Sequence, residues 1–477
     1  MLILLSLICK KTAPKTYEEL YNTAVQHFSA NEFEKAISLF KQVLEINPTI
    51  YKAYYNIGVC YQELRDTNRA IKYFHKTIQV NPNYTRAYQY LCTIFLQQKQ
   101  FKKVEDMCRT ILRLSKNNKM ALHNMGYALN RQGKQQEAIS YYKKVIELYP
   151  DFAPSHFEIA RAYLATGNFK EGWHHFEWRI KQYKWNIHPK NYDHLKLEDI
   201  KNKIILIKSE RGFGDCIQFL RYIPLLKKCG AKKIILTLFK PLVPLFKSCN
   251  SIDSIVTNKK EIPRHDIQIP IMSLPLIFET TYKTIPQNIP YLFANQKLTK
   301  QWEKILSEDK NFKIGLCWQS GPNPNLESNP LSRRSVPLEI FSDIADIENI
   351  TFYSLQRFEG ADQIYSTPAG FYVRTFGENF DTKNGSFMDT AAIMKNLDLV
   401  ISVDTAVAHL AGALGINTWI ILPCVAEWRW MQAIEHSPWY PTVKLFRQRK
   451  PQDYSYVIQK IKSEVKHLLS KGEANEK

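Results

Sequence analysis

Small and apolar residues recur along residues 17–180 with a period of about 34 residues. The interval from Pro48 to Pro82 occurs twice more between Pro82 and Pro150, and Lys116 stands at the skipped position. Within each period the apolar positions are spaced three or four residues apart, as on one face of an α-helix. The corresponding positions of the successive units are Ala24, Ala36 and Phe40; Gly58, Tyr61, Ala70 and Phe74; Leu91, Phe95, Val104 and Cys108; Gly126, Ala138 and Tyr142; and Ile159, Ala160, Tyr163 and Phe169. The pattern predicts about five helix pairs stacked as an α-solenoid.

These units resemble the tetratricopeptide repeat, which has small residues where paired helices cross and a proline at the end of each unit. The resemblance implies a concave face that binds a protein or peptide; an array that only supports or oligomerises the next domain is the alternative. The pattern breaks at residues 172–179, where we expect Trp173 and Trp178 to pack the end of the solenoid against the next domain. Residues 1–16 are expected to form an N-terminal lead and residues 181–202 a linker.

From Lys203 onward, short apolar runs alternate with helical stretches. Residues 204–207 and 233–238 suit buried parallel strands, and a second series of strands begins at residues 313–318 and continues to residue 422. Such alternation predicts two Rossmann-like α/β lobes, over residues 203–300 and 301–450, with ligands bound between the carboxyl ends of their strands. The amphipathic stretch 454–469, part of a C-terminal helix and tail at 451–477, is expected to return to the first lobe.

The stretch from Leu397 to Gly415 combines a strand, a tight turn and a helix start. The aliphatic run 399–403 breaks at Asp404 and Thr405, and small and apolar residues at helical spacing continue until Gly415. A helix N-terminus offers free backbone N–H groups and the positive end of a dipole, so a diphosphate suits it. A plain helix cap at Asp404 or Thr405 is the equally simple interpretation.

Composition narrows the class of protein only slightly. With 45% hydrophobic and 23% charged residues the chain is globular, and its nine scattered cysteines lack a C-x-x-C pair, which predicts reduced thiols in a cytoplasmic protein. The formal charge of +20 is spread along the chain without an arginine-rich patch or nucleic-acid motif, so we expect no nucleic-acid partner. Residues Leu2 to Cys9 are apolar but too short to span a bilayer, and we expect no integral membrane segment.

Three motifs, in this order, resemble glycosyltransferase family 9, the heptosyltransferase-like enzymes of GT-B fold. They are Gly-Phe-Gly-Asp at residues 212–215, Arg-Ser-Val-Pro at residues 334–337, and the stretch 404–415. The resemblance spans residues 203–448 and is closest to a bacterial subgroup in which tetratricopeptide repeats precede such a domain. It implies the transfer of a sugar from a nucleotide-sugar to an acceptor hydroxyl, with Asp215 as the catalytic base. The donor diphosphate would be held by Arg334, Thr405, Ala406 and His409.

Each of these roles has a structural alternative. Asp215 could only cap its helix, Arg334 could form a solvated surface pair with Arg333, and His409 could be a satisfied core histidine. The aromatic residues at 427–430 could stack on a sugar or base, although loop anchoring fits most of them. Further candidate donor contacts are Gly212, Gly214, Gln319, Gln356 and Asp404.

The sequence carries no Asp-x-Asp motif of the kind that chelates a cation on a diphosphate. We therefore expect an inverting, metal-independent transferase without metal ligands or a cofactor, for which the nucleotide-sugar is a substrate. The acceptor would be a lipopolysaccharide-type glycan or a protein side chain delivered by the repeats. The alternatives are an enzyme like the protein O-linked N-acetylglucosamine transferases, which also join such repeats to a GT-B domain, and a non-catalytic repeat scaffold with a ligand-binding domain.

Overall fold

The computed structural model describes residues 16–183, 195–210, 212–321 and 334–475. The chain divides into two compact units, residues 1–155 and residues 156–477, and each is described by itself. Three sequence-based expectations lie outside the described residues: the apolar lead at Leu2 to Cys9, most of the linker, and the pairing of Arg333.

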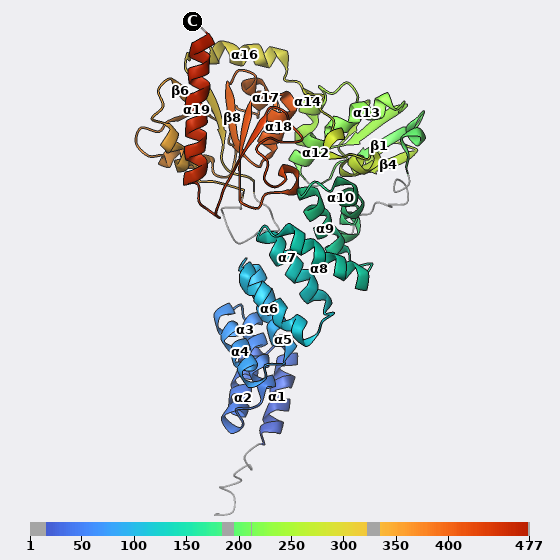
Figure 1. Cartoon of the computed structure of the whole chain (residues 1–477), viewed down its shortest axis with the longest axis vertical. Coiled ribbons are helices and arrows are strands. Elements are labelled where there is room, and N and C mark those ends of the chain that lie inside the picture. Colours follow the sequence, from blue (N-terminus) through green and yellow to red (C-terminus); the bar gives the residue numbers. More distant parts are fainter. Residues whose placement is uncertain (1–15, 184–194, 211, 322–333, 476–477) are drawn as a thin grey trace, which may run out of the picture. The chain divides into compact units, whose positions relative to one another are not determined.

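Four helix pairs make up the described part of the first unit. Each helix packs on its pair mate, and the second helix of each pair packs on the first helix of the next, which gives a solenoid (Figure 1). The predicted helix-pair repeat is therefore confirmed. The helices are α1 (Tyr17–Ser29), α2 (Phe33–Ile46), α3 (Tyr51–Glu63), α4 (Thr67–Val80), α5 (Thr85–Gln97), α6 (Phe101–Leu114), α7 (Lys119–Arg131) and α8 (Gln135–Leu148).

Glycine is required where paired helices cross most closely. A Cβ atom on Gly58 would lie 2.8 Å from Cε1 of the buried Phe74 ring, and one on Gly126 would lie 2.8 Å from Cε1 of Tyr142. Such distances are shorter than any ordinary carbon contact. The repeat period thus places a small residue on one helix opposite an aromatic ring on its mate.

A second regularity of the repeats is visible only in the backbone. The turn inside each pair contains one residue of left-handed conformation, with φ between 57° and 85°. Only two of these turns use glycine. The other three place a polar side chain in a conformation that glycine adopts at lower cost. The five positions are Asn31, Arg65, Lys99, Gly133 and Gly167.

The second unit begins with a fifth helix pair, whose apolar side chains belong to the same hydrophobic core as those of the sheets that follow. The pair consists of α9 (Ala153–Ala165), which crosses the boundary between the units, and α10 (Phe169–Phe176), followed by the short α11 (Arg179–Gln182). The Trp173 indole N–H donates to the backbone carbonyl of Thr280 at 2.9 Å, and its ring packs edge-on against Trp428. The expected burial of Trp173 is confirmed, whereas Trp178 stacks instead on His156, with ring centroids 3.8 Å apart.

A buried ion cluster lies beside the fifth helix pair. The Arg179 guanidinium donates to both carboxylate oxygens of Glu210, at 2.8 and 2.9 Å, and to the Ser273 hydroxyl at 2.7 Å. Both Arg179 and Glu210 are almost completely buried. Burial raises the pKa of the Glu210 carboxyl, and the Arg179 charge opposes that rise.

The first sheet has four parallel strands in the order β3-β2-β1-β4. Its strands are β1 (Ile204–Lys208), β2 (Lys233–Thr237), β3 (Ser254–Val256) and β4 (Ile267–Pro270), and its main helices are α12 (Phe213–Phe219), α13 (Ile223–Lys228), α14 (Val243–Phe246) and α15 (Leu274–Ile277). β1 pairs with β2 on one side and with β4 on the other, so the chain reverses its direction of winding at β1. Ligands of open parallel sheets bind at the carboxyl end of such a switch point.

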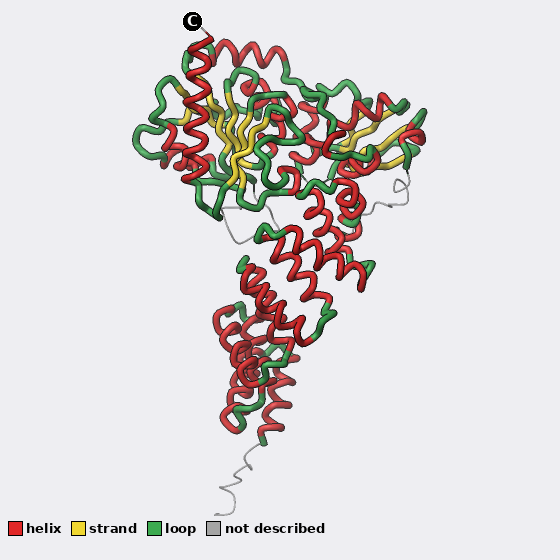
Figure 2. Tube along the Cα trace, in the orientation of Figure 1, coloured by secondary structure: helices red, strands yellow, loops and turns green. Residues whose placement is uncertain are grey.

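The second sheet has six parallel strands in the order β10-β9-β8-β5-β6-β7. Figure 2 draws the strands of the protein in yellow and its helices in red. The winding reverses between β5 and β8, so the turns after these two strands flank the second switch point. The strands are β5 (Phe312–Cys317), β6 (Ile350–Ser354), β7 (Val373–Arg374), β8 (Leu399–Val403), β9 (Thr418–Leu422) and β10 (Val443–Arg447), and the helices are α16 (Gln296–Leu306), α17 (Met388–Met394), α18 (Ala406–Leu414) and α19 (Ser455–Asn475).

The C-terminal helix corrects one prediction. Val457, Ile461 and Val465 of α19 are buried in the core of the second sheet, together with Leu399 of β8. The helix therefore covers the sheet that directly precedes it in the chain and does not return to the first lobe. Amphipathicity alone predicts that α19 has an apolar face, but it does not identify the sheet against which that face packs.

No helix within the described ranges is both long enough and apolar enough to cross a membrane.

Candidate functional site

The helix after β1 packs directly on the helix after β8. A Cβ atom on Gly214 of α12 would lie 2.7 Å from Cδ2 of His409 on α18, so only glycine permits this approach. Both helices start at the carboxyl ends of switch-point strands. The contact brings the Gly-Phe-Gly-Asp turn and the strand-turn-helix stretch, which are far apart in sequence, to one place (Figure 1).

Asp215 lies in the first turn of α12 and forms an ion pair across the junction of the two sheets. Its Oδ1 atom accepts a hydrogen bond from the Arg429 guanidinium at 2.7 Å, and its side chain is 17% exposed. Arg429 also donates to the side-chain oxygen of Gln218, one turn further along α12, at 2.5 Å. The first sheet thus supplies the carboxylate, and the loop after β9 supplies its counter-ion.

The stretch from Leu399 to Gly415 folds as the sequence predicts. β8 ends at Val403, Thr405 is the N-cap of α18, and Gly415 ends the helix with φ of 74°. The Thr405 hydroxyl accepts from the Ala408 N–H at 3.4 Å and lies 3.1 Å from the Ser402 hydroxyl. Thr405, and not Asp404, is therefore the residue that caps the helix.

Asp404 and His409 are both buried beneath this turn. The Nδ1 atom of His409 lies 2.9 Å from the Tyr440 hydroxyl, and its Nε2 atom lies 3.8 Å from Asp404. Burial and the charges of Arg429, Arg221 and Arg334 hold the pKa of His409 well below its usual value, so the ring is neutral near pH 7. Burial raises the pKa of Asp404, against the opposing influence of Arg334 and Arg429.

Arg334 reaches the same turn from the segment that joins β5 to β6. One guanidinium nitrogen lies 3.8 Å from the second carboxylate oxygen of Asp404, and the Arg334 side chain is 36% exposed. Among Arg334, Asp404 and His409, Arg334 alone presents substantial surface to solvent. It is therefore the residue of this trio that is best placed to meet an anion that approaches the start of α18.

Gln319 and Gln356 anchor the loops at the carboxyl ends of β5 and β6. The Gln356 carbonyl oxygen accepts from the backbone N–H groups of Trp318 and Gln319 at 3.1 and 3.0 Å. Its amide nitrogen donates to the carbonyls of Gln319 and Glu359 at 3.1 and 3.0 Å. The Gln319 side-chain oxygen accepts from Gln363 at 2.9 Å, so both glutamine side chains help to hold the loops.

Sequence reasoning missed the contribution of two arginines, Arg221 and Arg429, to this junction. Arg429 was included only in an aromatic cluster, and Arg221 was not considered. The Arg221 guanidinium is buried and donates to the backbone carbonyl of Trp439 at 2.5 Å and to the Tyr291 hydroxyl at 3.2 Å. The available signal was the spacing of Asp215, Gln218 and Arg221, because residues three apart along a helix are neighbours.

The first unit offers a tyrosine cluster as a candidate docking surface. Tyr55 lies within 5.1 Å of Tyr84 and 5.7 Å of Tyr90, and Tyr51 lies within 4.9 Å of Tyr84, measured between ring centroids. All four rings are partly exposed. Clustered tyrosines provide large, rigid contact area with a polar edge, which suits a protein partner.

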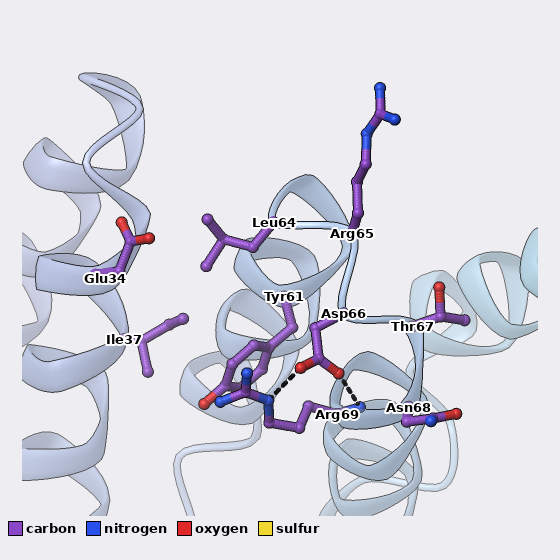
Figure 3. A pocket seen from close by; sticks show the side chains of 9 residues that line it. All are labelled: Glu34, Ile37, Tyr61, Leu64, Arg65, Asp66, Thr67, Asn68 and Arg69. Carbon is purple, nitrogen blue, oxygen red and sulfur yellow. Dashed lines mark hydrogen bonds and ion pairs between the residues drawn. The ribbon is translucent and has the colours of Figure 1, made fainter.

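A hollow of about 750 Å³ also lies on the first unit, between α2 and the turn that joins α3 to α4 (Figure 3). Its most prominent charges already satisfy each other, because the Asp66 carboxylate accepts from the backbone N–H and the side chain of Arg69. Glu34 and Ile37 of α2 face them across the opening. The hollow therefore contains an ion pair that the first unit forms within itself.

The model of the tetratricopeptide repeat family matches residues 51–84 and 120–152, which are the second and fourth helix pairs. The N-terminal helices are tetratricopeptide repeats. Arrays of such repeats bind proteins and peptides on their exposed faces.

Among known proteins, the chain is 23% identical over 360 residues to protein FlbA of Caulobacter vibrioides, which covers 70% of this chain and 59% of FlbA. The chain thus spans less than two thirds of that relative. It is 30% identical over 81 residues to the peroxisomal targeting signal receptor of Kluyveromyces lactis, or 17% of this chain and 14% of the receptor.

Two solved structures align with part of this chain. MamA aligns at 21% identity with a TM-score of 0.32, covering 34% of this chain and 94% of MamA. YrrB, described as a TPR protein with an unusual peptide-binding site, aligns at 22% identity with a TM-score of 0.33, covering 35% of this chain and 87% of YrrB.

Proposed function

We propose that residues 203–450 form a GT-B glycosyltransferase that moves a sugar from a nucleotide-sugar to an acceptor hydroxyl. The observation that carries the proposal is the contact between α12 and α18, which brings Asp215 and the start of α18 together at the two switch points. Parallel sheets of this kind bind ligands at such points, and a helix N-terminus there suits a diphosphate. The family 9 motifs supply the same residues in the same order.

In the proposed reaction, Asp215 takes the proton of the acceptor hydroxyl while that oxygen attacks the anomeric carbon. The bond from this carbon to the diphosphate oxygen breaks, and the nucleoside diphosphate leaves with the bonding electrons. Arg334 and the backbone N–H groups at Thr405 and Ala406 offset the negative charge that develops on it. One displacement at the anomeric carbon inverts its configuration.

The environments of Asp404 and His409 support an indirect role for both. His409 is neutral, 3% exposed and bonded to Tyr440, so it serves the diphosphate by holding the start of α18 in place. Asp404 is buried next to Arg334 and orients its guanidinium group. Asp404 is not assigned a direct contact with the diphosphate, because its carboxylate would repel that group.

The repeats would bring the acceptor, or a protein that carries it, to the transferase. The tyrosine cluster around Tyr55 is the surface that we assign to this contact. Transfer assays with a glycan acceptor and with a protein acceptor distinguish the two classes of acceptor.

The test is a thermal-stabilisation screen of nucleoside diphosphates and nucleotide-sugars, followed by donor hydrolysis and transfer assays. We expect one donor to raise the melting temperature, and we expect Asp215→Asn to bind it but lose turnover by at least about 100-fold. Arg334→Ala should weaken donor binding. Asp346→Asn, which removes an exposed carboxylate paired with Lys462, is the matched control and should leave both unchanged. A wild-type protein that binds no nucleotide-sugar and no nucleoside diphosphate would contradict the proposal.

One observation favours a non-catalytic alternative. Asp215 is already paired with Arg429 at 2.7 Å, an arrangement that a ligand-binding domain without turnover could also use. The two functions differ in one measurement, since a scaffold would bind the donor and leave its sugar–phosphate bond intact over hours.

A further inference from the structure

We propose that Arg429 is a positioning residue that fixes the orientation of the Asp215 carboxylate for proton transfer. The inference rests on the proposed transferase function and goes beyond it, because none of the family motifs assigns a role to this arginine. It follows from the geometry of the guanidinium group, from the packing that holds Arg429, and from the two elements that it joins.

The guanidinium of Arg429 spans one turn of α12. One terminal nitrogen donates to Asp215 Oδ1 at 2.7 Å, and the other donates to Gln218 Oε1 at 2.5 Å. Residues three apart lie on the same face of a helix, so the planar fork meets both acceptors at once. A charge-assisted contact of this kind restricts rotation of the carboxylate much more than a single neutral hydrogen bond would.

The second carboxylate oxygen of Asp215 is the one that Arg429 leaves for a substrate. A Cβ atom on Gly212 would lie 3.2 Å from this Oδ2 atom, so the absence of a side chain at Gly212 keeps its surroundings open. Arg429 thus determines which oxygen is bound and which can accept a proton. Proton transfer needs the acceptor oxygen within hydrogen-bond reach of the substrate hydroxyl, so loss of this orientation should reduce turnover.

Arg429 is itself held rigidly. It lies in the short 3-10 helix Trp428–Trp430, is 9% exposed, and its guanidinium carbon lies 5.1 Å from the centre of the Trp428 ring. Trp428 packs on Trp173 of the fifth helix pair, and the neighbouring Glu427 forms an ion pair with Arg161 of α9 at 3.0 Å. The orientation of Asp215 therefore depends on a loop of the second sheet that the fifth helix pair supports.

The experiment compares Arg429→Lys, Arg429→Ala and Arg447→Ala in the full chain, with the donor identified by the screen above. Arg447 is the matched control, because it donates to the carbonyls of Trp430 and Met431 in the same loop and has no contact with Asp215. We expect Arg429→Ala to lower kcat by about 100-fold with a change in donor KM of less than about threefold. Arg429→Lys should recover only a small part of kcat, because lysine keeps the charge but lacks the fork.

Chemical rescue separates positioning from a general structural effect. Guanidinium ion at tens of millimolar should raise kcat of Arg429→Ala severalfold and leave Arg447→Ala and the wild type unchanged. The inference is overturned if Arg429→Lys keeps full kcat, or if Arg429→Ala shows the wild-type kcat per folded molecule. If Arg429→Ala does not fold, Arg429→Lys and Gln218→Leu decide, and wild-type kcat in either variant would refute the role. A wild-type protein without donor binding or turnover would instead refute the transferase function.

Discussion

The crossing of α12 and α18 should respond strongly to a single added methyl group. In Gly214→Ala the new Cβ atom would lie 2.7 Å from Cδ2 and 3.4 Å from Nε2 of His409. Carbon atoms in contact prefer about 3.5 to 4.0 Å, so the helices must separate by roughly 1 Å. The imidazole cannot turn away, because Tyr440 holds its Nδ1 atom at 2.9 Å and the Trp430 ring stacks on it.

The expected destabilisation of Gly214→Ala is about 1–3 kcal/mol, the range for overpacking a tight contact. Alanine is the better helix former by up to about 1 kcal/mol, so the net effect should lie in the lower half of this range. A displacement of about 1 Å between Asp215 and the start of α18 should also lower transferase activity, by up to about 100-fold.

Tryptophan fluorescence during urea unfolding is a selective assay, since all nine tryptophans lie in residues 156–477. Gly321→Ala is the control, because a Cβ atom at Gly321 meets nothing within 4 Å. A double-mutant cycle with His409→Ala isolates the contact: once the ring is gone, Gly214→Ala should cost less than about 0.5 kcal/mol. The reasoning fails if Gly214→Ala is as stable as the wild type, or if its cost is the same with and without His409.

Three further perturbations test other parts of the structure. Arg179→Met leaves the buried Glu210 carboxylate without its counter-ion and should lower the free energy of unfolding, measured by tryptophan fluorescence, by about 3–5 kcal/mol. A loss below about 1 kcal/mol would contradict the described ion cluster. The pKa of His409 is lowered in the folded protein, so only the unfolded chain takes up a proton at this histidine as the pH falls through 6.5. The free energy of unfolding of the wild type should therefore fall by up to about 2 kcal/mol relative to that of His409→Gln between pH 7.5 and pH 5. A constant difference between the two proteins would show that the folded histidine titrates normally. Gly58→Ala should destabilise the first unit by about 1–3 kcal/mol, because the added methyl group would clash with the Phe74 ring. Far-ultraviolet circular dichroism measures this loss. A lowered midpoint of the unfolding transition detected by tryptophan fluorescence would show that the effect is not confined to the first unit.

Periodicity predicted the elements whose neighbours are close in sequence. The repeats and the β8–α18 stretch follow from spacing, because helix pairs and strand-turn-helix units are determined by local patterns and caps. The left-handed turns at Arg65 and Lys99 did not follow, because the stacked helices impose that conformation on residues that do not favour it. The destination of α19 was wrong for a similar reason, since an apolar stripe does not identify the face that it covers.

The candidate site was predicted only as far as motifs reach. The proximity of the Asp215 turn and the α18 start was inferred from two motifs, and the structure brings them into contact through Gly214. The roles assigned to Asp215, Arg334 and Thr405 stay predictions until a donor is identified. Arg429 was missed because its partner Asp215 is distant in the chain, and no local pattern encodes a pairing of that range.

The position of the fifth helix pair bears on how the number of repeat units in this protein can change during evolution. Its core is continuous with that of the first sheet, while the joint with the preceding repeats falls inside α9, a helix of repeat type. A gene that gained or lost whole repeat units ahead of α9 would join one repeat helix to another and leave the core that α9 and α10 share with the first sheet intact. Descendants of such a gene could acquire longer or shorter arrays, and with them different partners, without any compensating substitution around Asp215.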